Sequence, residues 1–439
     1  MPITHENEYV IWLRQSAPYI NAHRGKTFVV YFGGEAILDP YFSELLHDLA
    51  LLNCLGIRLV IVHGIRPQID QRIHSNGSKA AYFNGLRITD ALALDAVKEA
   101  SGTARVEIEA ILSMGLAGSP LAGAQIRVTS ANFITAKPVG VREGIDFQHT
   151  GEVRRVDVDG IRSALDREDI VLLSAVGYSP SGEIFNLRSE EVATATAIAL
   201  KADKLIFLTE APVQRISESN SISQLTSDEA QDLIGAPGDL PEAVRSEMKA
   251  AVHACIHGVE RVHCLDRHQA GGVLLELFTR DGIGTLISLS PFELIRSAKV
   301  SDISGIQRLI MPLEHAGVLI HRSKERIEME VGDYLVIERD GLIIGCAALH
   351  VYPGASSAEL ACLVLHQDYQ GEQRGRRLVA KIEEKARKLG IKTLFVLTTQ
   401  TAHWFLERGF DPCSVEDLPE ERRIAYNTHR NSKVLSKSL

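Results

Sequence analysis

The segment Asp368–Arg377 combines two glycines with arginines at Arg374, Arg376 and Arg377. It follows an apolar run typical of a strand and precedes a helical pattern. The backbone N–H groups of such a loop and of the helix start can hold a pyrophosphate, to which the arginines add positive charge. A basic, solvated helix start has the same composition. The segment therefore indicates phosphate binding, with the solvated helix start as the alternative.

Glu359 is the one charged residue in the otherwise apolar run Ala358–Leu365. Burial raises the pKa of a carboxyl group, and a raised pKa suits a general base, which can act directly or through a water molecule. The alternative is a glutamate at a strand edge that pairs with a lysine. The run predicts a catalytic base if it lines a cleft.

Histidines and cysteines gather between residues 253 and 268. His253 and His257 stand at i and i+4 around Cys255, a spacing that suits zinc. The segment lacks the glutamate of an HExxH motif and has no CxxC pair. We therefore expect no metal, and we expect Cys362, which stands in an apolar run, to be a packing residue.

Residues 1–285 alternate between short apolar runs and helical patterns, which predicts an open α/β sandwich with a largely parallel sheet. Helices are expected at Tyr41–Leu55 and Thr89–Ala100, and a surface loop at Ser217–Asp228. The predicted strands are Thr27–Phe32, Ile57–Val62, Ile126–Thr129, Ile170–Ser174 and Lys204–Thr209.

The pattern changes after about residue 288, so we predict domains at 1–288 and 289–439. A helix begins near Ser301 and is followed by a hairpin around Asp340-Gly341. The expected elements of this α+β domain are strands at Tyr334–Glu338, Leu342–His350, Ala358–Leu365 and Thr393–Thr398, a helix that ends at Gly390 and a short helix at Thr401–Arg408.

Composition excludes several classes of protein. The 439 residues are 45% hydrophobic and 23% charged, with a net charge of −9, so a disordered chain and a basic nucleic-acid-binding surface are both disfavoured. No apolar stretch suits a membrane span, and six scattered cysteines predict reduced thiols in a cytoplasmic protein. Tyr9, Leu13, Ala17 and Ile20 recur at helical spacing, and this stripe is expected to pack on a second subunit or on its own domain.

The carboxyl-terminal third resembles the GNAT acetyltransferase family. Gln370 and Gly375 match its acyl-CoA loop, Gln-x-x-Gly-x-Gly/Ala, but Gln373 stands at the first glycine. Phe405, before Gly409-Phe410, stands where the family often has the tyrosine that protonates the thiolate. The resemblance implies acetyl-CoA as co-substrate, held by Gln370, Gln373, Arg374, Gly375 and Arg376 and polarised by the backbone at Cys362, Leu363 and Val364.

The amino-terminal part resembles the amino-acid kinase family, and the acetylglutamate kinases in particular. Tyr31 occupies the position of a catalytic lysine, and Val62–Arg66 replaces a run of three glycines. No second lysine is evident near Glu247, although Lys249 is close in sequence. Because phosphoryl transfer depends on such charges and amides, this part is expected to have lost kinase activity.

A kinase-like domain followed by a GNAT domain resembles the layout of the bacterial N-acetylglutamate synthase family, as do the runs Gly56–Asp70, Leu187–Ala193, Arg280–Thr285 and Tyr426–Leu435. This resemblance implies acetyl transfer to the α-amine of L-glutamate, the first step of arginine biosynthesis. The implied site residues are Glu359 as base, Thr398 as a proton donor to the thiolate, and Arg322, Arg430 and Ser432 for glutamate.

The same resemblance implies feedback inhibition by L-arginine, which would be held by Lys201, Glu276, Gly282 and Gly284 in the first domain. It also implies a homo-oligomer, with a hexamer as the usual form. Two alternatives remain open at this point. One is a bifunctional synthase–kinase, and the other is an arginine-responsive binding protein whose GNAT domain is inactive.

Overall fold

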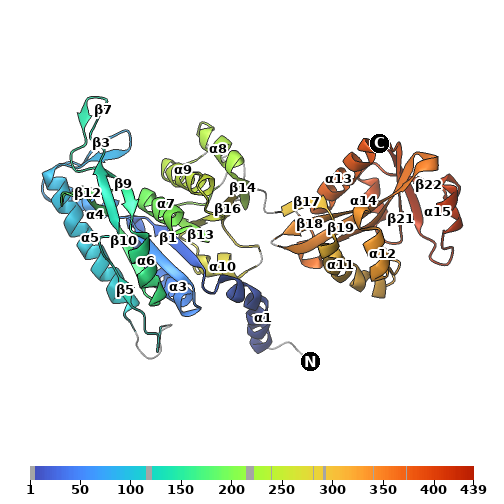
Figure 1. Cartoon of the computed structure of the whole chain (residues 1–439), viewed down its shortest axis with the longest axis horizontal. Coiled ribbons are helices and arrows are strands. Elements are labelled where there is room, and N and C mark those ends of the chain that lie inside the picture. The colour runs from blue at the N-terminus through green and yellow to red at the C-terminus, as the bar shows by residue number, and fades with distance from the viewer. Residues whose placement is uncertain are drawn as a thin grey trace. The chain divides into compact units, whose positions relative to one another are not determined.

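The structure, a computed structural model, describes residues 5–114, 121–213, 222–238, 240–279, 281–289, 293–339, 341–371 and 373–439. The chain forms two compact units, residues 1–290 and 291–439 (Figure 1). Within the described residues, no helix is both long and apolar enough to cross a membrane.

An eight-stranded sheet forms the centre of the first unit, in the order β14-β16-β15-β13-β1-β2-β10-β5. Its middle strands run parallel, as the nearly continuous apolar runs predict. The strand bounds are β1 Thr27–Phe32, β2 Arg58–His63, β5 Val128–Thr129, β10 Ile170–Ser174, β13 Lys204–Thr209, β14 Gln224–Thr226, β15 Val262–Asp266 and β16 Thr285–Ser288.

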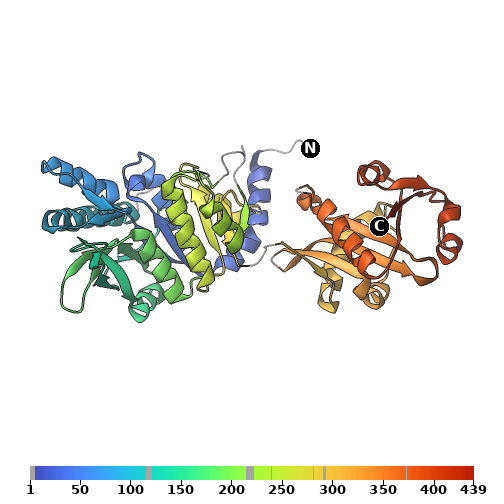
Figure 2. The ribbon, with the colours of Figure 1, turned by 90° about the horizontal axis from the view of Figure 1, so that it is seen from above.

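Helices cover both faces of this sheet, which confirms the predicted sandwich (Figures 1 and 2). Alternate residues of β1 point to opposite faces, so Phe28 and Val30 pack in one core and Val29 and Tyr31 in the other. The first core includes α3 (Phe42–Cys54), α5 (Ala91–Leu112) and α10 (Gly272–Phe278). The second includes α6 (Val158–Asp166), α7 (Ser189–Leu200), α8 (Ser227–Gly235) and α9 (Glu242–Ile256).

The amino-terminal helix α1 (His5–His23) lies against α10 of its own unit. The Ser16 hydroxyl donates to the carbonyl of Phe278 at 3.2 Å, and His23 Nε2 lies 2.9 Å from the carbonyl oxygen of Leu277. Part of the helix nevertheless presents apolar side chains to solvent, because Val10, Ile11 and Leu13 are each more than 40% exposed.

Some predicted elements of this unit differ from the structure. The helix expected to end at Ala100 continues through Gly102 to Leu112, because the buried stripe Ala100, Ala104, Ile108 outweighs the cost of about 1 kcal/mol of one helical glycine. Of the loop expected at 217–228, residues 217–221 lie outside the described residues, and the rest holds β14 and the start of α8.

The sequence pattern did not reveal the smaller elements. A second sheet has the order β12-β11-β6-β9, from β6 Ile134–Pro138, β9 Gly151–Val156, β11 Val176–Tyr178 and β12 Ile184–Asn186. Two hairpins pair β3 Ala81–Phe83 with β4 Leu86–Ile88 and β7 Val141–Arg142 with β8 Ile145–Asp146. Short helices α2 (Gly34–Ile37) and α4 (Arg66–Ser75) follow β1 and β2.

The second unit contains a seven-stranded sheet in the order β17-β18-β19-β20-β21-β23-β22. Its strands are β17 Glu293–Ser297, β18 Tyr334–Arg339, β19 Leu342–Tyr352, β20 Ser357–Leu365, β21 Thr393–Thr398, β22 Asp411–Cys413 and β23 Lys433–Ser438. The predicted hairpin joins β18 to β19, although Asp340 itself lies outside the described residues. All neighbours are antiparallel except β20 and β21.

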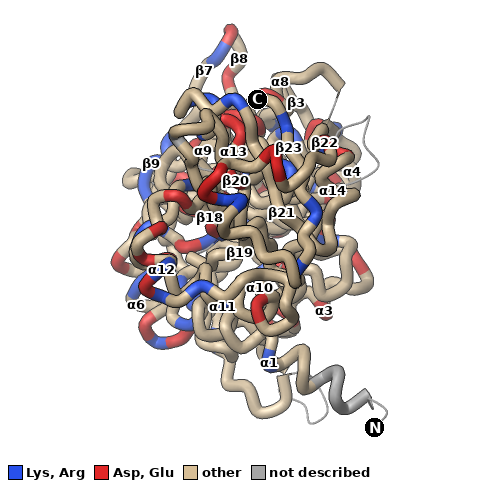
Figure 3. The backbone as a smooth tube through the Cα atoms, turned by 90° about the vertical axis from the view of Figure 1, so that its right-hand side faces the viewer, with Lys and Arg blue, Asp and Glu red and all other residues tan. Residues whose placement is uncertain are grey.

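Helices cover both faces of this sheet too. One core joins the sheet to α13 (Arg374–Lys388) and to Phe405 of α14 (Ala402–Leu406), and the other joins it to α11 (Ile303–His315) and α12 (Lys324–Met329). The remaining helices are α15 (Glu420–Ile424) and the 3-10 turns Val300–Asp302, Val331–Asp333, Pro353–Ala355, Gln367–Tyr369 and Val415–Asp417. Basic and acidic residues are interspersed along this unit rather than segregated (Figure 3).

Candidate active site

The two parallel strands of the second unit separate partway along their length. β20 pairs with β21 only at Ser357–Glu359, opposite Thr393–Phe395, although β20 continues to Leu365 and β21 to Thr398. Where two neighbouring strands stop pairing, they separate, and the backbone N–H and C=O groups that face each other have no partner in the sheet. The candidate site therefore begins where Glu359 makes the last pair.

A β-bulge lies in β20 just beyond Glu359. Ala348 pairs with Ala361 and Cys346 with Val364, so Cys362 and Leu363 together oppose the single residue Ala347. Cys362 has a φ of +53°, in the left-handed region. Because a bulge takes a residue out of the hydrogen-bond ladder and re-aims its backbone, the segment 362–364 has amide groups that the regular sheet would not offer.

Glu359 is 8% exposed, as a base in a cleft requires, but its partner is unexpected. Arg422 of α15 donates to both of its oxygens, at 2.6 and 3.3 Å. Burial lowers the pKa of Arg422, but its hydrogen bond to Glu359 and the charge of that carboxylate produce a net increase. Burial and the Glu359 carboxylate raise the pKa of the neighbouring Tyr352 to about 12.

Arg422 is a site residue that the sequence did not single out. It lies in the charged run Glu420–Arg423, where nothing distinguishes it from its exposed neighbours. The partner of Glu359 is therefore an arginine and not the lysine considered above. Because Arg422 donates to both carboxylate oxygens, it holds the orientation of Glu359 and places a positive charge beside it.

Arg322 and Arg430 come from distant segments and meet near this carboxylate. Arg430 donates through Nη2 to the carbonyl of Val318, in the loop that leads to Arg322. Burial and the charge of Arg322 lower the pKa of Arg430. Burial lowers the pKa of Arg322, but the surrounding groups, including Cys362 and Glu359, raise it overall. Within the described residues, neither Nε atom has a hydrogen-bond partner, although both are buried.

Ser432 lies close in sequence to Arg430 and is partly buried. Its carbonyl accepts a hydrogen bond of 2.8 Å from the hydroxyl of Tyr426. That contact closes the turn that carries Arg430 before the chain enters β23.

The predicted phosphate loop leads into the N-terminus of α13. Gly371 and Gln373 have φ values of +109° and +55°, and Gln373 is the residue before the first turn of the helix. Gln370, Gln373 and Arg376 are exposed, so their groups are free to meet a ligand from solvent. A Cβ on Gly375 would lie 3.1 Å from Trp404, so this glycine permits close packing of the helix start.

Arg374 corrects one expectation. Its guanidinium does not extend into the loop but turns into the fold, where Nε and Nη2 donate to Glu293 of β17 at 2.8 and 2.6 Å. The residue is only 4% exposed. Arg377 also forms an ion pair with Glu293, at 3.6 Å, while its side chain stays about half exposed. The side-chain charge nearest to a phosphate at the start of α13 therefore comes from the exposed Arg376, while Arg374 contributes its backbone position.

Thr398 ends β21 on the other side of the opening. Its hydroxyl accepts hydrogen bonds from the amides of Gln400 and Thr401 at 3.3 and 3.0 Å and lies 2.9 Å from the Thr401 hydroxyl. It thus caps the turn into α14. Phe405 is 3% exposed and packs edge-on against Phe410, so the position of the family tyrosine is part of the core.

In the first unit, Glu276 lies in a buried polar cluster. His263 Nδ1 is 2.5 Å from one Glu276 oxygen, and the amides of Ile283 and Gly284 donate to the other at 2.7 and 2.9 Å. His263 Nε2 lies 3.2 Å from Lys204 Nζ. Because an ammonium group only donates, Nε2 accepts and Nδ1–H donates to Glu276.

The charges in this cluster follow from its contacts. Burial would raise the pKa of Glu276, but hydrogen bonds from His263 and the two amides lower it to about 2. Burial and Lys204 lower the pKa of His263. Gly282 has a φ of +62°, and a Cβ there would lie 2.4 Å from Glu276 Oε2. The cluster thus brings together Glu276, Gly282 and Gly284 as predicted.

Lys201 makes no hydrogen bond or ion pair with the described residues of that cluster. It is exposed and ends α7 with a φ of +53°. The lysine that reaches the cluster is Lys204, at the start of β13, which is 7% exposed. Both lysines lie in the same short turn, so the sequence alone did not distinguish them.

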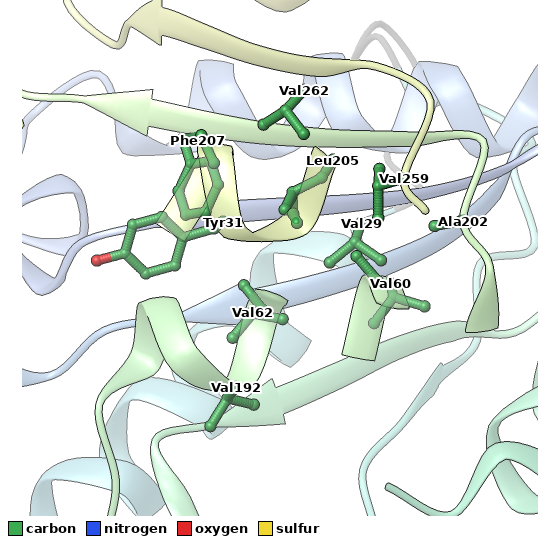
Figure 4. Packing of buried hydrophobic residues seen from close by; sticks show 14 of the residues in the cluster. Val29, Tyr31, Val60, Val62, Val192, Ala202, Leu205, Phe207, Val259 and Val262 are labelled. Carbon is green, nitrogen blue, oxygen red and sulfur yellow. The ribbon is translucent and has the colours of Figure 1, made fainter. Parts of the chain in front are cut away.

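The kinase-like positions carry neutral or acidic groups. Tyr31 is 5% exposed, packs edge-on against Phe207 at 5.3 Å and points its hydroxyl away from the valines of the core (Figure 4). Burial and the carboxylates of Glu190 and Glu247 raise its pKa. Burial also raises the pKa of Glu247, followed by the effect of Glu190. A Cβ on Gly64 would lie 2.8 Å from the Gly34 amide, so close glycine packing is retained.

The side chains of the histidine-rich segment 253–268 point to different parts of the first unit. His253 and His257 stack on the surface at 4.0 Å between ring centroids, and the buried Cys255 thiol donates to the carbonyl of Ile287. Throughout the part of the chain that the structure describes, no three His, Cys, Asp or Glu residues are arranged to hold a metal ion.

Comparison with protein families matches both units. The amino acid kinase family model matches residues 26–266, and the acetyltransferase (GNAT) family model matches residues 304–410. Together with the fold, these matches define the class of the protein, a GNAT acetyltransferase unit joined to an amino acid kinase fold.

Comparison with individual proteins identifies the family more closely. The chain is 49% identical over 432 residues to the amino-acid acetyltransferase of Pseudomonas syringae pv. syringae, over 98% of this chain and 100% of that protein. The chain therefore belongs to the amino-acid acetyltransferase family, and it is an amino-acid N-acetyltransferase. This confirms the resemblance that the sequence indicated.

Two solved structures of N-acetylglutamate synthase from Neisseria gonorrhoeae are also similar, each at 38% identity over 98% of this chain and 99% of that chain. One is complexed with coenzyme A and L-arginine and gives a TM-score of 0.88. The other is complexed with coenzyme A and N-acetyl-glutamate and gives a TM-score of 0.63.

Proposed function

We propose that this enzyme transfers the acetyl group of acetyl-CoA to the α-amine of L-glutamate, within residues 289–439. The observation that carries the proposal is the meeting of Arg322 and Arg430, whose buried Nε atoms have no partner in the described residues, beside the carboxylate of Glu359. Two neighbouring guanidinium groups repel each other unless an anion lies between them. A dicarboxylic amino acid supplies two carboxylates, which arginine binds in a planar, two-pronged manner.

The reaction needs a proton acceptor and an oxyanion site. Glu359, held by Arg422, accepts a proton from the substrate ammonium through a water molecule, and the free amine then attacks the thioester carbon. Backbone amides at the bulge, Cys362–Val364, stabilise the oxyanion. The carbon–sulfur bond breaks, the nitrogen that has attacked gives up its second proton, and that proton neutralises the thiolate. We propose the Thr398 hydroxyl as the relay, because it can donate a proton to the thiolate and take up the one released by the nitrogen.

Acetyl-CoA binds through the loop before α13. The first-turn N–H groups of a helix have no partners within it and attract a pyrophosphate. Gln370, Gln373, Gly375 and Arg376 border this helix start. The Neisseria gonorrhoeae relative was solved with coenzyme A, which supports the same co-substrate here.

The test is the release of free thiol from acetyl-CoA with L-glutamate as acceptor, beside a panel of other amino acids. We expect release that depends on glutamate and gives N-acetylglutamate as product. Turnover with a different amino acid, and not with glutamate, would identify that amino acid as the acceptor substrate. No turnover with any acceptor would favour a binding protein, and ATP-dependent phosphorylation of N-acetylglutamate would favour a bifunctional enzyme, which Tyr31 and Glu247 disfavour.

We also propose that residues 1–288 bind L-arginine as an inhibitor, as suits a cytoplasmic enzyme of arginine biosynthesis. The ionised Glu276, fixed by His263 and two amides, presents a buried carboxylate for a guanidinium, and Lys204 offers a cation for the arginine carboxylate. The relative complexed with L-arginine supports this assignment. Lys204 takes the role first expected of Lys201.

The exposed apolar side chains of α1 support a homo-oligomer. Ile11 and Leu13 are 46% and 45% exposed on a helix that is otherwise anchored to α10. Such a patch commonly marks a protein interface. Sedimentation velocity tests the proposal. We expect a species larger than a monomer that Ile11→Asp dissociates, and a wild-type monomer at all concentrations would contradict it.

A further inference from the structure

Tyr334, the first residue of β18, has a hydroxyl group that the fold leaves unsatisfied. The residue is 0% exposed, and its hydroxyl oxygen is buried without a hydrogen-bond partner among the described residues. A buried polar group without a partner costs about 1–3 kcal/mol of stability. Phenylalanine would fill the same volume without that cost, so the hydroxyl calls for an explanation.

The sheet register places Tyr334 on the candidate site face. It pairs with Ala348 of β19, which pairs with Ala361 of β20, so these three side chains share one row and one face. The next row on that face contains His350 and Glu359, two residues further along β19 and β20. Directly paired side chains lie about 5 Å apart and diagonal ones about 7–8 Å. Tyr334 therefore lies on the same face as the proposed base, one row and two strands away, with His350 as its diagonal neighbour.

The polar groups around Tyr334 belong to the same site. Burial raises its pKa, followed by the effect of Cys362, while Arg322 acts in the opposite direction. The hydroxyl thus stays protonated and is available as a neutral donor. The Cys346 thiol lowers the pKa of Cys362, and the Tyr334 hydroxyl, which faces the Cys362 sulfur, acts in the same direction. Sulfur is only a weak acceptor and Arg322 is only a donor, so neither gives the hydroxyl a strong partner.

Three unsatisfied groups near the site are donors: Arg322 Nε and Arg430 Nε are N–H donors, and Tyr334 contributes an O–H donor. Arg322 links them, because it acts on both Tyr334 and Arg430. Glu330 Oε2, which acts on Tyr334 and Arg322, is an unsatisfied acceptor beside them. A ligand that satisfies the three donors must bring several acceptor oxygens.

We propose that the Tyr334 hydroxyl donates a hydrogen bond to a carboxylate oxygen of the acceptor amino acid, beside Arg322, and so selects an acidic acceptor. This inference rests on the proposed function and names a specificity-determining residue for it. A buried donor left unpaired by an apolar analogue penalises that analogue, and such sites discriminate strongly between substrates.

Tyr334→Phe tests the inference, with Tyr178→Phe in the first unit as the matched control. In thiol-release assays we expect the KM for L-glutamate to rise about five- to tenfold in Tyr334→Phe, since one hydrogen bond is worth about 1 kcal/mol. The KM for acetyl-CoA should not change. The preference in kcat/KM for glutamate over norvaline, which lacks the side-chain carboxylate, should fall by a similar factor. Tyr178→Phe should leave all of these values unchanged.

A second readout separates binding from packing. Without ligand, Tyr334→Phe should unfold at the same temperature as the wild type or a higher one, because it removes an unsatisfied hydroxyl. The rise in Tm that saturating glutamate produces should be smaller in the variant. An unchanged KM for glutamate and an unchanged glutamate-induced shift would overturn the inference alone. Absence of glutamate turnover by the wild type would overturn it together with the proposed function.

Discussion

At the scale of single residues, the main chemical feature of the candidate site is a pair of half-buried arginines whose Nε atoms have no hydrogen-bond partner within the described residues. Burial and, to a lesser extent, the charge of Arg322 lower the pKa of Arg430, and Glu359 already pairs with Arg422. Under the proposed function, the negative charge that these arginines lack arrives with the substrate. The same reasoning explains why three buried donors here have no partner within the described fold.

Replacement of Arg322 by lysine should therefore weaken substrate binding while the fold is kept. Lysine retains the charge but cannot form a planar, two-pronged contact. We expect the KM for glutamate to rise at least tenfold with a smaller change in kcat, as measured by initial rates. Arg326→Lys, on the exposed side of α12, is the control. Equal KM values for the two variants would contradict a substrate contact at Arg322.

Glu359→Gln should remove the base. An amide of the same shape cannot accept the proton, and general-base catalysis contributes about 10²–10⁴-fold. We expect kcat to fall by at least about 100-fold, with the KM for acetyl-CoA unchanged. Because the substitution also takes an anion from Arg422, thermal unfolding must be recorded in parallel. A folded variant with nearly normal kcat would exclude Glu359 as the base.

At the scale of elements, the bulge in β20 and the start of α13 shape the opening between β20 and β21. Both depend on residues in the left-handed region, Cys362 and Gln373, neither of which is glycine. A non-glycine residue pays about 1–2 kcal/mol for that conformation. The family has a glycine where this chain has Gln373. Glycine adopts a positive φ without this cost, which explains why the family favours glycine at this position.

Gln373→Gly should consequently stabilise the protein, or leave it unchanged where the extra freedom of the unfolded chain offsets the gain. We expect an increase in the free energy of unfolding of up to about 1 kcal/mol, with thiol release retained. Urea denaturation followed by circular dichroism measures the change. A loss of more than 1 kcal/mol would show that the Gln373 side chain makes contacts that offset its strained backbone.

At the scale of the whole molecule, the chain has two units. We propose that the second contains the acyl-transfer groups, and the first matches the amino acid kinase family, with Tyr31 and Glu247 at the positions where catalytic lysines were expected. One of the ordered polar clusters in the first unit is the cluster around Glu276. Inhibition through this cluster requires that arginine binding change the free energy of the other unit, and such coupling is usually 1–3 kcal/mol.

Glu276→Gln should weaken inhibition by arginine without affecting acetyl transfer. The glutamine amide lacks the charge that attracts a guanidinium. We therefore expect the arginine concentration that gives half inhibition to increase at least tenfold. Turnover without arginine should be unchanged. Thiol release at a series of arginine concentrations measures this, and His253→Gln on the surface of α9 is the control. Unchanged inhibition in a folded variant would place the arginine site elsewhere.

Sequence patterns alone determined much of this protein. The apolar runs predicted β1, β10, β13 and β21 to the residue, because buried parallel strands leave a local signature. Glu359 stood out as a single charge in an apolar strand, and family motifs brought Arg322, Arg430 and Glu276 forward. These features are local in the chain, or are carried by short motifs.

The tertiary structure determined which side chains form hydrogen bonds and ion pairs with each other. Arg422 meets Glu359 across 63 residues, Arg374 turns to Glu293 across 81, and Lys204 rather than Lys201 reaches His263. Tyr334 became notable only when the register placed its unsatisfied hydroxyl on the face of Glu359. The physical reason is that hydrogen bonds and ion pairs between distant segments depend on side-chain direction and burial, which the order of residues along a chain does not encode locally.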